Sequence, residues 1–148
     1  MGTYYKGSKE KRAALNSYIK LIRCAESLTA RLHPVLYQVG LSEGQFGILD
    51  ALYHIGSLSQ KELGAKLLKS GGNITMVVDN LEKRELVKRE RNEADRRYFT
   101  IHLTTKGKII FEQTFPLVLK ALVDEMKALT DDEQSALQRI CKLLGKKS

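Results

Sequence analysis

Residues 58–107 read LSQKELGAKLLKSGGNITMVVDNLEKRELVKRERNEADRRYFTIHLTTKG, and the fold follows from this stretch. Its first half carries apolar residues at helical spacing, interrupted by the turn-forming residues 69–72. Its second half carries two short segments in which apolar and polar residues alternate, separated by the polar residues 92–96. The stretch therefore predicts two short helices joined by a turn and followed by a β-hairpin with a charged tip.

The second helix of this stretch, predicted over about residues 73–84, has one apolar and one polar face. Its inward positions are Ile74, Val77, Val78 and Leu81. Its outward positions are Asn73, Met76, Asp79, Asn80 and Lys83. An outward asparagine can read adenine through two hydrogen bonds, and Ser70 and Thr75 can bind phosphate beside the helix N-terminus. The helix is a candidate for the major groove of DNA, although an amphipathic helix in a helical bundle would carry the same pattern.

The predicted hairpin, with strands over Leu86–Arg91 and Tyr98–Leu103, concentrates positive charge. The basic residues in the hairpin and just before it are Arg84, Lys88, Arg89, Arg91, Arg96 and Arg97. Asp95 stands two residues before Arg97, a separation at which a carboxylate in a hairpin tip can hold a guanidinium in one orientation. An oriented arginine can enter a narrow minor groove with its negative potential. A solvated charged hairpin is the alternative interpretation.

Further helices are predicted on both sides of this block. One spans about Ser8–Val39 with Pro34 inside it, and a break into two helices at Pro34 is the alternative. Another begins at the capping box Ser42-Glu43-Gly44-Gln45, and the same kind of pattern, Ser59-Gln60-Lys61-Glu62, starts the first short helix of the block. Behind the hairpin, helices are predicted over Thr104–Leu129 and after the capping box that opens at Thr130. The first helix is too long to cover its apolar stripe within so small a chain, so we expect a partner chain to cover it.

The composition fits one intracellular domain. The 148 residues suffice for one hydrophobic core, no apolar run is long enough for a transmembrane helix, and the polar N-terminus does not look like a signal peptide. Cys24 and Cys141 stand far apart, which favours a reducing, cytoplasmic location over a disulfide scaffold. Both cysteines are interpreted as packing residues, and a redox role, above all oxidant sensing by Cys24, is the alternative. The net charge of +8, from 25 Lys and Arg against 17 Asp and Glu, favours a polyanionic partner.

Motifs for catalysis do not stand out in the sequence. We find no Ser/His/Asp or Cys/His arrangement, no phosphate-binding loop and no metal-ligand pair, so we expect neither an enzyme nor a bound metal or cofactor. An RNA- or ribosome-associated protein remains the alternative to a DNA-binding one, because the basic charge suits it. RNA readers usually stack bases on exposed aromatic residues, and the helix at residues 73–84 has none.

Several segments of the chain carry a family pattern: Leu58–Leu67, then Ser70–Arg89 with its Ile74-Thr75, Val78-Asp79 and Leu86-Val87 pairs, then Asp95-Arg96-Arg97, then Leu103–Gly107. In these segments the sequence resembles the MarR family of transcriptional regulators. It departs from the family at Glu85, where relatives often have Gly, and at Gly71 and Gly72, which replace side chains that many relatives use on DNA. Since glycine is favoured where φ is positive, Glu85 is expected to strain or reshape the turn before the predicted hairpin.

This resemblance implies a mainly α-helical fold with a small β-hairpin wing. One domain would span residues 1–148, with a winged helix-turn-helix at 42–104 for DNA binding and dimerisation helices at 8–40 and 105–148. The family resemblance further implies a homodimeric repressor that binds a palindromic operator in double-stranded DNA. Such regulators usually release DNA when a small molecule, an oxidant or a metal binds.

The residues expected to contact DNA, in part from the resemblance, are Ser70, Asn73, Thr75, Met76, Asn80, Asp95, Arg96 and Arg97. Within this set, Asn73 and Thr75 would read or anchor the major groove, while Asp95 would hold Arg97 for the minor groove. The family's effector pocket would lie near Tyr37, Phe46 and His54. Aromatic walls with a nearby cation suit a small aromatic or anionic effector.

Overall fold

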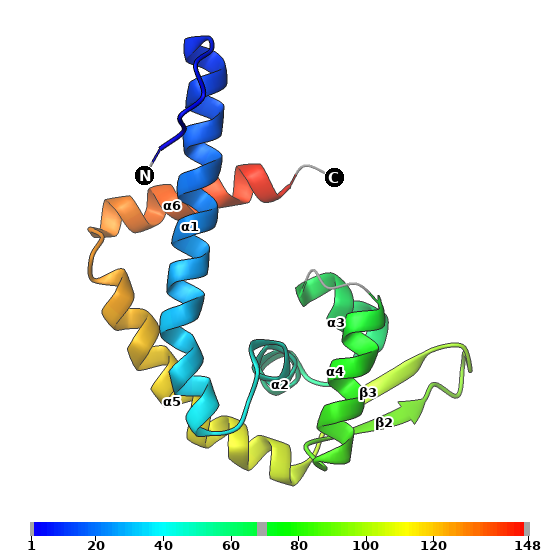
Figure 1. Ribbon diagram of the computed structural model, residues 1–148. Helices are drawn as coiled ribbons and strands as arrows, with labels where there is room; N and C mark the ends of the chain where they lie inside the picture. Colours follow the sequence, from blue (N-terminus) through cyan, green and yellow to red (C-terminus); the bar gives the residue numbers. More distant parts are fainter. Residues whose placement is uncertain (1, 68–70, 147–148) are drawn as a thin grey trace. The chain divides into compact units, whose positions relative to one another are not determined.

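The computed structural model describes residues 2–67 and 71–146. Figure 1 shows the elements in chain order. They are α1 (Lys9–Gln38), α2 (Glu43–Ile55), β1 (Leu58–Ser59), α3 (Gln60–Leu67), α4 (Gly71–Lys83), β2 (Val87–Arg91), β3 (Phe99–Leu103), α5 (Thr105–Met126) and α6 (Asp131–Gly145). This order confirms the predicted fold class, a mainly helical chain with a small β-hairpin, and adds one short strand.

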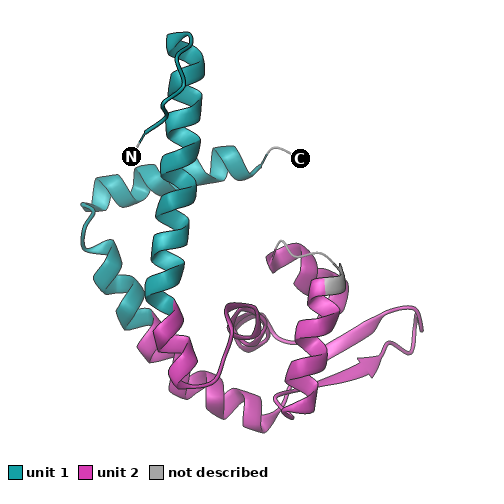
Figure 2. Ribbon diagram, viewed as in Figure 1, with its two compact units in different colours: residues 1–32, 119–148 teal, residues 33–118 magenta. Residues whose placement is uncertain are grey.

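The chain divides into two compact units, which Figure 2 distinguishes by colour. Residues 1–32 and 119–148 form the first unit, called the arm unit below. Residues 33–118 form the second, called the head unit. The head unit contains the whole of α2, α3, α4 and the sheet, while α1 and α5 contribute residues to both units.

Three helix starts are fixed by short capping sequences, as predicted. At Ser42 the hydroxyl accepts the backbone N–H of Gln45, whose side-chain oxygen accepts the backbone N–H of Ser42. Ser59 and Glu62 form the same reciprocal pair ahead of α3, and Thr130 and Glu133 form it at α6. Each pair satisfies N–H groups that a helix start leaves without intrahelical partners. The starts are therefore encoded within four residues.

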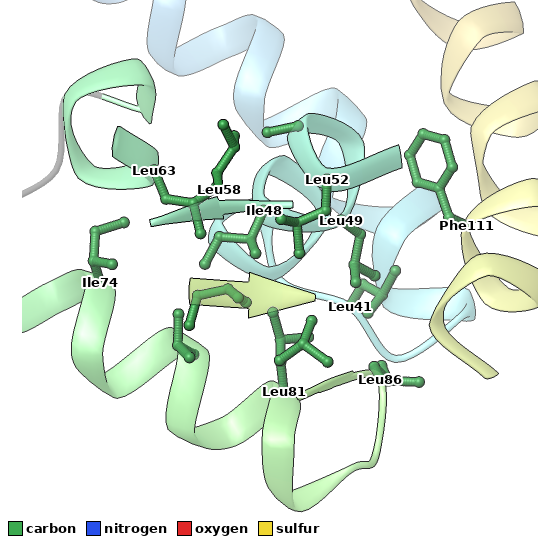
Figure 3. Packing of buried hydrophobic residues seen from close by; sticks show 14 residues of the cluster. Leu41, Ile48, Leu49, Leu52, Leu58, Leu63, Ile74, Leu81, Leu86 and Phe111 are labelled. Carbon is green, nitrogen blue, oxygen red and sulfur yellow. The ribbon is translucent and has the colours of Figure 1, made fainter. Parts of the chain in front are cut away.

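The head unit is built around one apolar core (Figure 3). Its fully buried members include Ile48, Leu49, Leu63, Ile74, Val78, Leu81, Leu86, Ile101 and Phe111. The inward face predicted for α4 is confirmed at Ile74, Val78 and Leu81, whereas Val77 is half-buried. Because one face of α4 is committed to this core, its opposite face is held toward solvent.

The sheet is antiparallel, in the order β1-β3-β2. The hairpin pairs β2 with β3 from Val87 opposite Leu103 to Arg91 opposite Phe99, within one residue of the predicted strand bounds. The strand β1 was not predicted, because two residues are too few to show an alternating pattern. Leu58 of this strand lies opposite Ile101 and is buried, so the strand joins the start of α3 to the sheet.

Two boundaries differ from the prediction. α4 begins at Gly71 rather than at Asn73, since the weak helix propensity of glycine is overridden once the following residues pack. α1 continues through Pro34 as one helix to Gln38, so the predicted alternative of a break there is not observed. The buried side chain of Leu36 anchors this last turn although Pro34 supplies no backbone N–H.

The arm unit has no buried core of its own. Every residue described in 2–32 and 119–146 is exposed or half-buried. The exposed large apolar residues on its helices are Leu15, Tyr18, Leu21, Ile22, Leu119, Val123, Leu137, Ile140, Leu143 and Leu144. Cys24 and Cys141, which were interpreted as packing residues, are both exposed in the single chain. They lie on helices whose apolar faces find no cover in the single chain.

One ion pair ties two helices of the arm unit together. Arg31 donates from Nε and Nη2 to the two carboxylate oxygens of Glu125, at 2.7 and 3.0 Å. The guanidinium holds the pKa of Glu125 below its usual value, as expected when the charged form of a carboxyl accepts such bonds.

None of the helices in the described part of the chain combines the length and apolarity that crossing a bilayer demands.

The turn between α4 and β2 carries backbone strain. Glu85 has φ of 61°, in the left-handed region that favours glycine. Its N–H donates to the carbonyl of Glu82, and the N–H of Leu86 donates to the carbonyl of Leu81. This is the Schellman arrangement of a helix end. α1 ends in the same way, but there the left-handed residue is Gly40, with φ of 70°. The departure at Glu85 therefore leaves the turn's shape unchanged and adds strain.

Replacing Glu85 with glycine should stabilise the protein. The expected gain in free energy of unfolding is about 0.5–1 kcal/mol, because the relief of left-handed strain exceeds the entropy cost of glycine in the unfolded chain. Lys83→Gly, at the last residue of α4, is the control and should lose a similar amount. Urea titrations of the two variants test this, and a loss of stability in Glu85→Gly would contradict the strain.

Candidate nucleic-acid interface

The outward face of α4 forms the first part of the candidate interface. Asn73, Met76 and Asn80 are all exposed, and Met76 as a residue is 57% exposed. The structure thus brings three of the predicted DNA-contacting residues to one solvent-facing side of a helix. Ser70, also predicted, lies outside the described residues.

Thr75 is exposed on the same helix but is tied to α3. Its Oγ1 accepts a hydrogen bond from Nε2 of Gln60 at 2.7 Å. Gln60 is the first residue of α3 and was not among the predicted site residues. The contact links the two helices of the helix-turn-helix at the side chain predicted to anchor the major groove.

The hairpin tip forms the second part and is closed by its own hydrogen bonds. Oδ1 of Asn92 accepts the backbone N–H groups of Ala94 and Asp95, at 2.8 and 3.2 Å. The backbone of Tyr98 donates to the carbonyl of Asp95 and accepts from Asn92. An asparagine that bonds to the backbone two residues on is a common way of fixing a turn. The tip therefore presents Arg96 and Arg97 from a defined backbone.

Asp95 holds Arg97, as predicted from their spacing. Nε of Arg97 donates to Oδ1 of Asp95 at 3.0 Å, and Nη2 donates to Oδ2 at 2.8 Å. The backbone N–H of Arg97 also donates to Oδ1. These bonds hold the pKa of Asp95 below its usual value. The Arg97 side chain is nevertheless 83% exposed, so an oriented positive charge projects from the wing.

A third group links the wing to the helices and was missed from the sequence. Arg89 of β2 contacts Asp79 and Glu82 of α4 and Gln60 of α3. The sequence showed Arg89 as one of several basic residues in the hairpin, with no signal that separated it from the others. Its partners come from two elements, α3 and α4, which only the folded chain brings to β2.

The predicted effector residues are brought together only in part. Phe46 and His54 both contact the ring of Phe111, each with ring centroids 5.6 Å apart. Tyr37 instead pairs with His33 and is 76% exposed. Within the ranges that the structure describes, no three His, Cys, Asp or Glu side chains gather as metal ligands would.

Comparison with known proteins identifies the family. Residues 41–99 match the model of the MarR family. The HTH-type transcriptional regulator MhqR of Bacillus subtilis is 30% identical over 132 residues, which are 89% of this chain and 91% of MhqR. The chain belongs to the MarR family. It is thus a DNA-binding transcriptional regulator of the winged-helix type, from a family of regulators rather than enzymes.

Solved structures share the fold of this chain. AbsC, a MarR family transcriptional regulator from Streptomyces coelicolor, has a TM-score of 0.86 at 19% identity, covering 96% of this chain and 97% of AbsC. A cysteine-to-serine mutant of MarR from E. coli, complexed with operator DNA, has a TM-score of 0.77 at 28% identity. That match covers 84% of this chain and 91% of the E. coli protein.

Arg97→Ala should weaken specific DNA binding by on the order of tenfold to a hundredfold and relax sequence preference at minor-groove positions. The variant loses the projecting guanidinium that Asp95 orients. Arg97→Lys is the matched control, because an ammonium keeps the charge but cannot bond both carboxylate oxygens as a guanidinium does. It should retain affinity for non-specific DNA while losing the preference. Equal affinity and preference in all three proteins would remove the wing from the interface.

Proposed function

We propose that the protein is a homodimeric repressor that binds a palindromic operator in double-stranded DNA and releases it when a small effector binds. One observation carries the DNA-binding part of this proposal. The exposed face of α4, with Asn73, Met76 and Asn80, and the oriented Arg97 of the wing belong to one compact unit with a single core. In this proposal they are the reading elements for the two grooves.

The chemistry of the two surfaces suits different grooves. Asn73 and Asn80 carry amides, which can pair with the donor and acceptor pattern of bases in the major groove. Thr75 and Ser70 would contact phosphates beside the helix N-terminus. Arg97, helped by Asp95 and Arg96, would enter the minor groove, where a narrow groove concentrates negative potential. The operator complex of E. coli MarR, which is 28% identical to this chain, supports duplex DNA as the partner.

A homodimer is proposed from the arm unit. Leu15, Tyr18 and Ile22 follow i, i+3, i+7 spacing on α1, and Leu137, Ile140 and Leu144 follow it on α6. Such stripes left exposed on a helix indicate a surface that packs against another. A second copy would cover them, with residues 8–40 and 105–148 as dimerisation helices and 42–104 as the DNA-binding part. A two-fold dimer presents two copies of the DNA-binding head unit, so its operator would be a palindrome.

The proposed effector is a small aromatic or anionic molecule that binds near Phe46 and His54. The support is the aromatic group around Phe111, against which the rings of Phe46 and His54 both pack. Tyr37 is kept as a third candidate on the basis of the family resemblance. Thermal shifts with a panel of aromatic acids test the effector, and no stabilisation by any of them would argue against it. The cytoplasm, where bacterial chromosomal DNA lies, is the proposed location.

Selection of bound duplexes from a random DNA library at moderate salt tests the proposed function. We expect enrichment of an inverted repeat whose half-site centres are about 10–10.5 bp apart. Binding without enrichment, lost steeply as salt rises, would mean only general affinity for polyanions. Competition by RNA of equal length separates the RNA-binding alternative, which predicts that RNA displaces the duplex.

A further inference from the structure

Arg89 lies among the elements that the proposed function uses, yet it is not exposed as Arg97 is. Its side chain is only 18% exposed, against 83% for Arg97. The guanidinium lies 5.5 Å from the ring centroid of Phe99 on the neighbouring strand. Its Nε is buried and has no hydrogen-bond partner in the part of the chain that the structure describes. Leaving a buried donor unpaired is costly, so other contacts of Arg89 must offset that cost.

The first of these contacts join the wing to α4. Nη1 of Arg89 lies 2.7 Å from Oδ1 of Asp79 and 3.8 Å from Oε1 of Glu82. The backbone N–H of Arg89 also donates to Oε2 of Glu82, at 2.8 Å. Both the side chain and the main chain of β2 are therefore attached to the last two turns of α4. Figure 1 shows α4 and β2 side by side.

The remaining contact reaches the exposed face of α4 through α3. Nη2 of Arg89 donates to Oε1 of Gln60 at 3.3 Å, and Nε2 of Gln60 donates to Oγ1 of Thr75 at 2.7 Å. Because Arg89 is a donor only, it fixes which end of the Gln60 amide faces it. The nitrogen of that amide is thereby directed to Thr75. Arg89 thus influences a predicted DNA-contacting side chain without lying beside it.

We propose that Arg89 is a positioning residue for DNA recognition. It holds the wing, α4 and the start of α3 in one arrangement, so that the major-groove and minor-groove elements keep a fixed spacing. This inference rests on the proposed function and adds a residue that acts through Asp79, Glu82 and Gln60. Two nearby carboxylates and limited exposure leave Arg89 poorly placed to bind a phosphate itself. A positioning role and a phosphate contact make different predictions for the salt dependence of binding.

The test compares Arg89→Met, Arg89→Lys and Gln60→Ala with the wild-type protein. Methionine keeps an unbranched chain over Phe99 but removes the charge and the hydrogen bonds. The probes are a 30-bp duplex with the most enriched inverted repeat and a scrambled duplex of the same composition. We expect Arg89→Met to weaken binding to the inverted repeat by about tenfold or more and to the scrambled duplex by less than about threefold. Arg89→Lys should recover part of the loss, since lysine can reach Asp79 but lacks the fork that also holds Gln60.

Two further measurements separate positioning from direct contact. The slope of log affinity against log salt should be unchanged in Arg89→Met, whereas loss of a phosphate contact lowers it by about one. Gln60→Ala, a variant at a half-buried helix start, should weaken specific binding less than Arg89→Met. The double variant should lose less affinity for the inverted repeat than the product of the two single fold-losses, because the two residues act through one contact. The Gln60→Ala variant alone keeps the inference testable if Arg89→Met does not fold.

The outcomes distinguish this inference from the proposed function. If the wild type does not discriminate between the duplexes, the proposed function fails and this inference fails with it. If the wild type discriminates and Arg89→Met does so equally, only the role of Arg89 is wrong. A uniform loss on both duplexes with a lower salt slope would identify Arg89 as a phosphate contact instead.

Discussion

Gly107→Ala is expected to destabilise the protein by about 3 kcal/mol or more. Gly107 is buried in the first turn of α5. A Cβ there would overlap the carbonyl oxygen of Leu86 and lie 3.0 Å from its carbonyl carbon and 2.9 Å from Cδ1 of Leu103. The oxygen of Leu86 cannot withdraw easily, because it accepts the backbone N–H of Thr104. The cost therefore falls on the backbone rather than on a flexible side chain.

The absence of a side chain at Gly107 permits a close contact between the start of α5 and residues 85–86, called the joint below. This joint explains why the Gly107→Ala substitution should affect more than α5. Thr104 donates from Oγ1 to the carbonyl of Glu85, and its Oγ1 accepts the N–H of Gly107. The start of α5 is thus bonded to the strained turn that separates α4 from the wing. Displacing Gly107 would move that turn, so we expect weaker DNA binding as well as lower stability.

Gly145→Ala is the matched control for Gly107→Ala. No atom lies within 4 Å of a Cβ built at Gly145, which ends α6. Alanine is favoured over glycine in a helix, so this variant should be neutral or slightly more stable. Chemical denaturation of both variants checks the prediction. Equal free energies of unfolding for the two variants would show that the joint can relax without cost.

The sequence predicted the features of this fold that depend on local signals. The capping pairs at Ser42, Ser59 and Thr130 involve residues only three positions apart, so they are visible in a linear pattern. The pairing of Asp95 with Arg97 is equally local. The strain at Glu85 was also expected, because a left-handed helix end usually requires glycine and the sequence offers none there.

The features that the sequence did not predict depend on contacts between distant segments. Arg89 acquires its role from residues 60, 79 and 82, and a single basic residue in a charged hairpin gives no sign of such partners. β1 is held in the sheet by its pairing with β3 rather than by its own two residues. The exposure of Cys24 and Cys141 likewise depends on which faces of α1 and α6 the single chain covers.

Ile22→Asp is expected to dissociate the proposed dimer. Ile22 lies on the exposed stripe of α1 with Leu15 and Tyr18, and the residue is 38% exposed in the single chain. If a second copy covers this stripe, two-fold symmetry places the new charge on both sides of the contact. A buried charge without a partner costs about 3–5 kcal/mol, enough to shift the mass in sedimentation from twice 16.7 kDa to that of one chain. Leu21→Asp, at the neighbouring position, should act in the same direction.

The dimer variant also separates assembly from DNA contact. Ile55→Asp is the control, because Ile55 is 56% exposed at the end of α2 and belongs to neither of the two segments, 8–40 and 105–148, that are proposed to dimerise. It should remain dimeric and bind the inverted repeat as the wild type does. Ile22→Asp keeps both reading elements but loses the linkage of two half-sites, so its affinity should approach that of one head for one half-site. A dimeric mass for Ile22→Asp would place the two-fold contact elsewhere, whereas a monomer with undiminished affinity would mean that one head suffices for recognition.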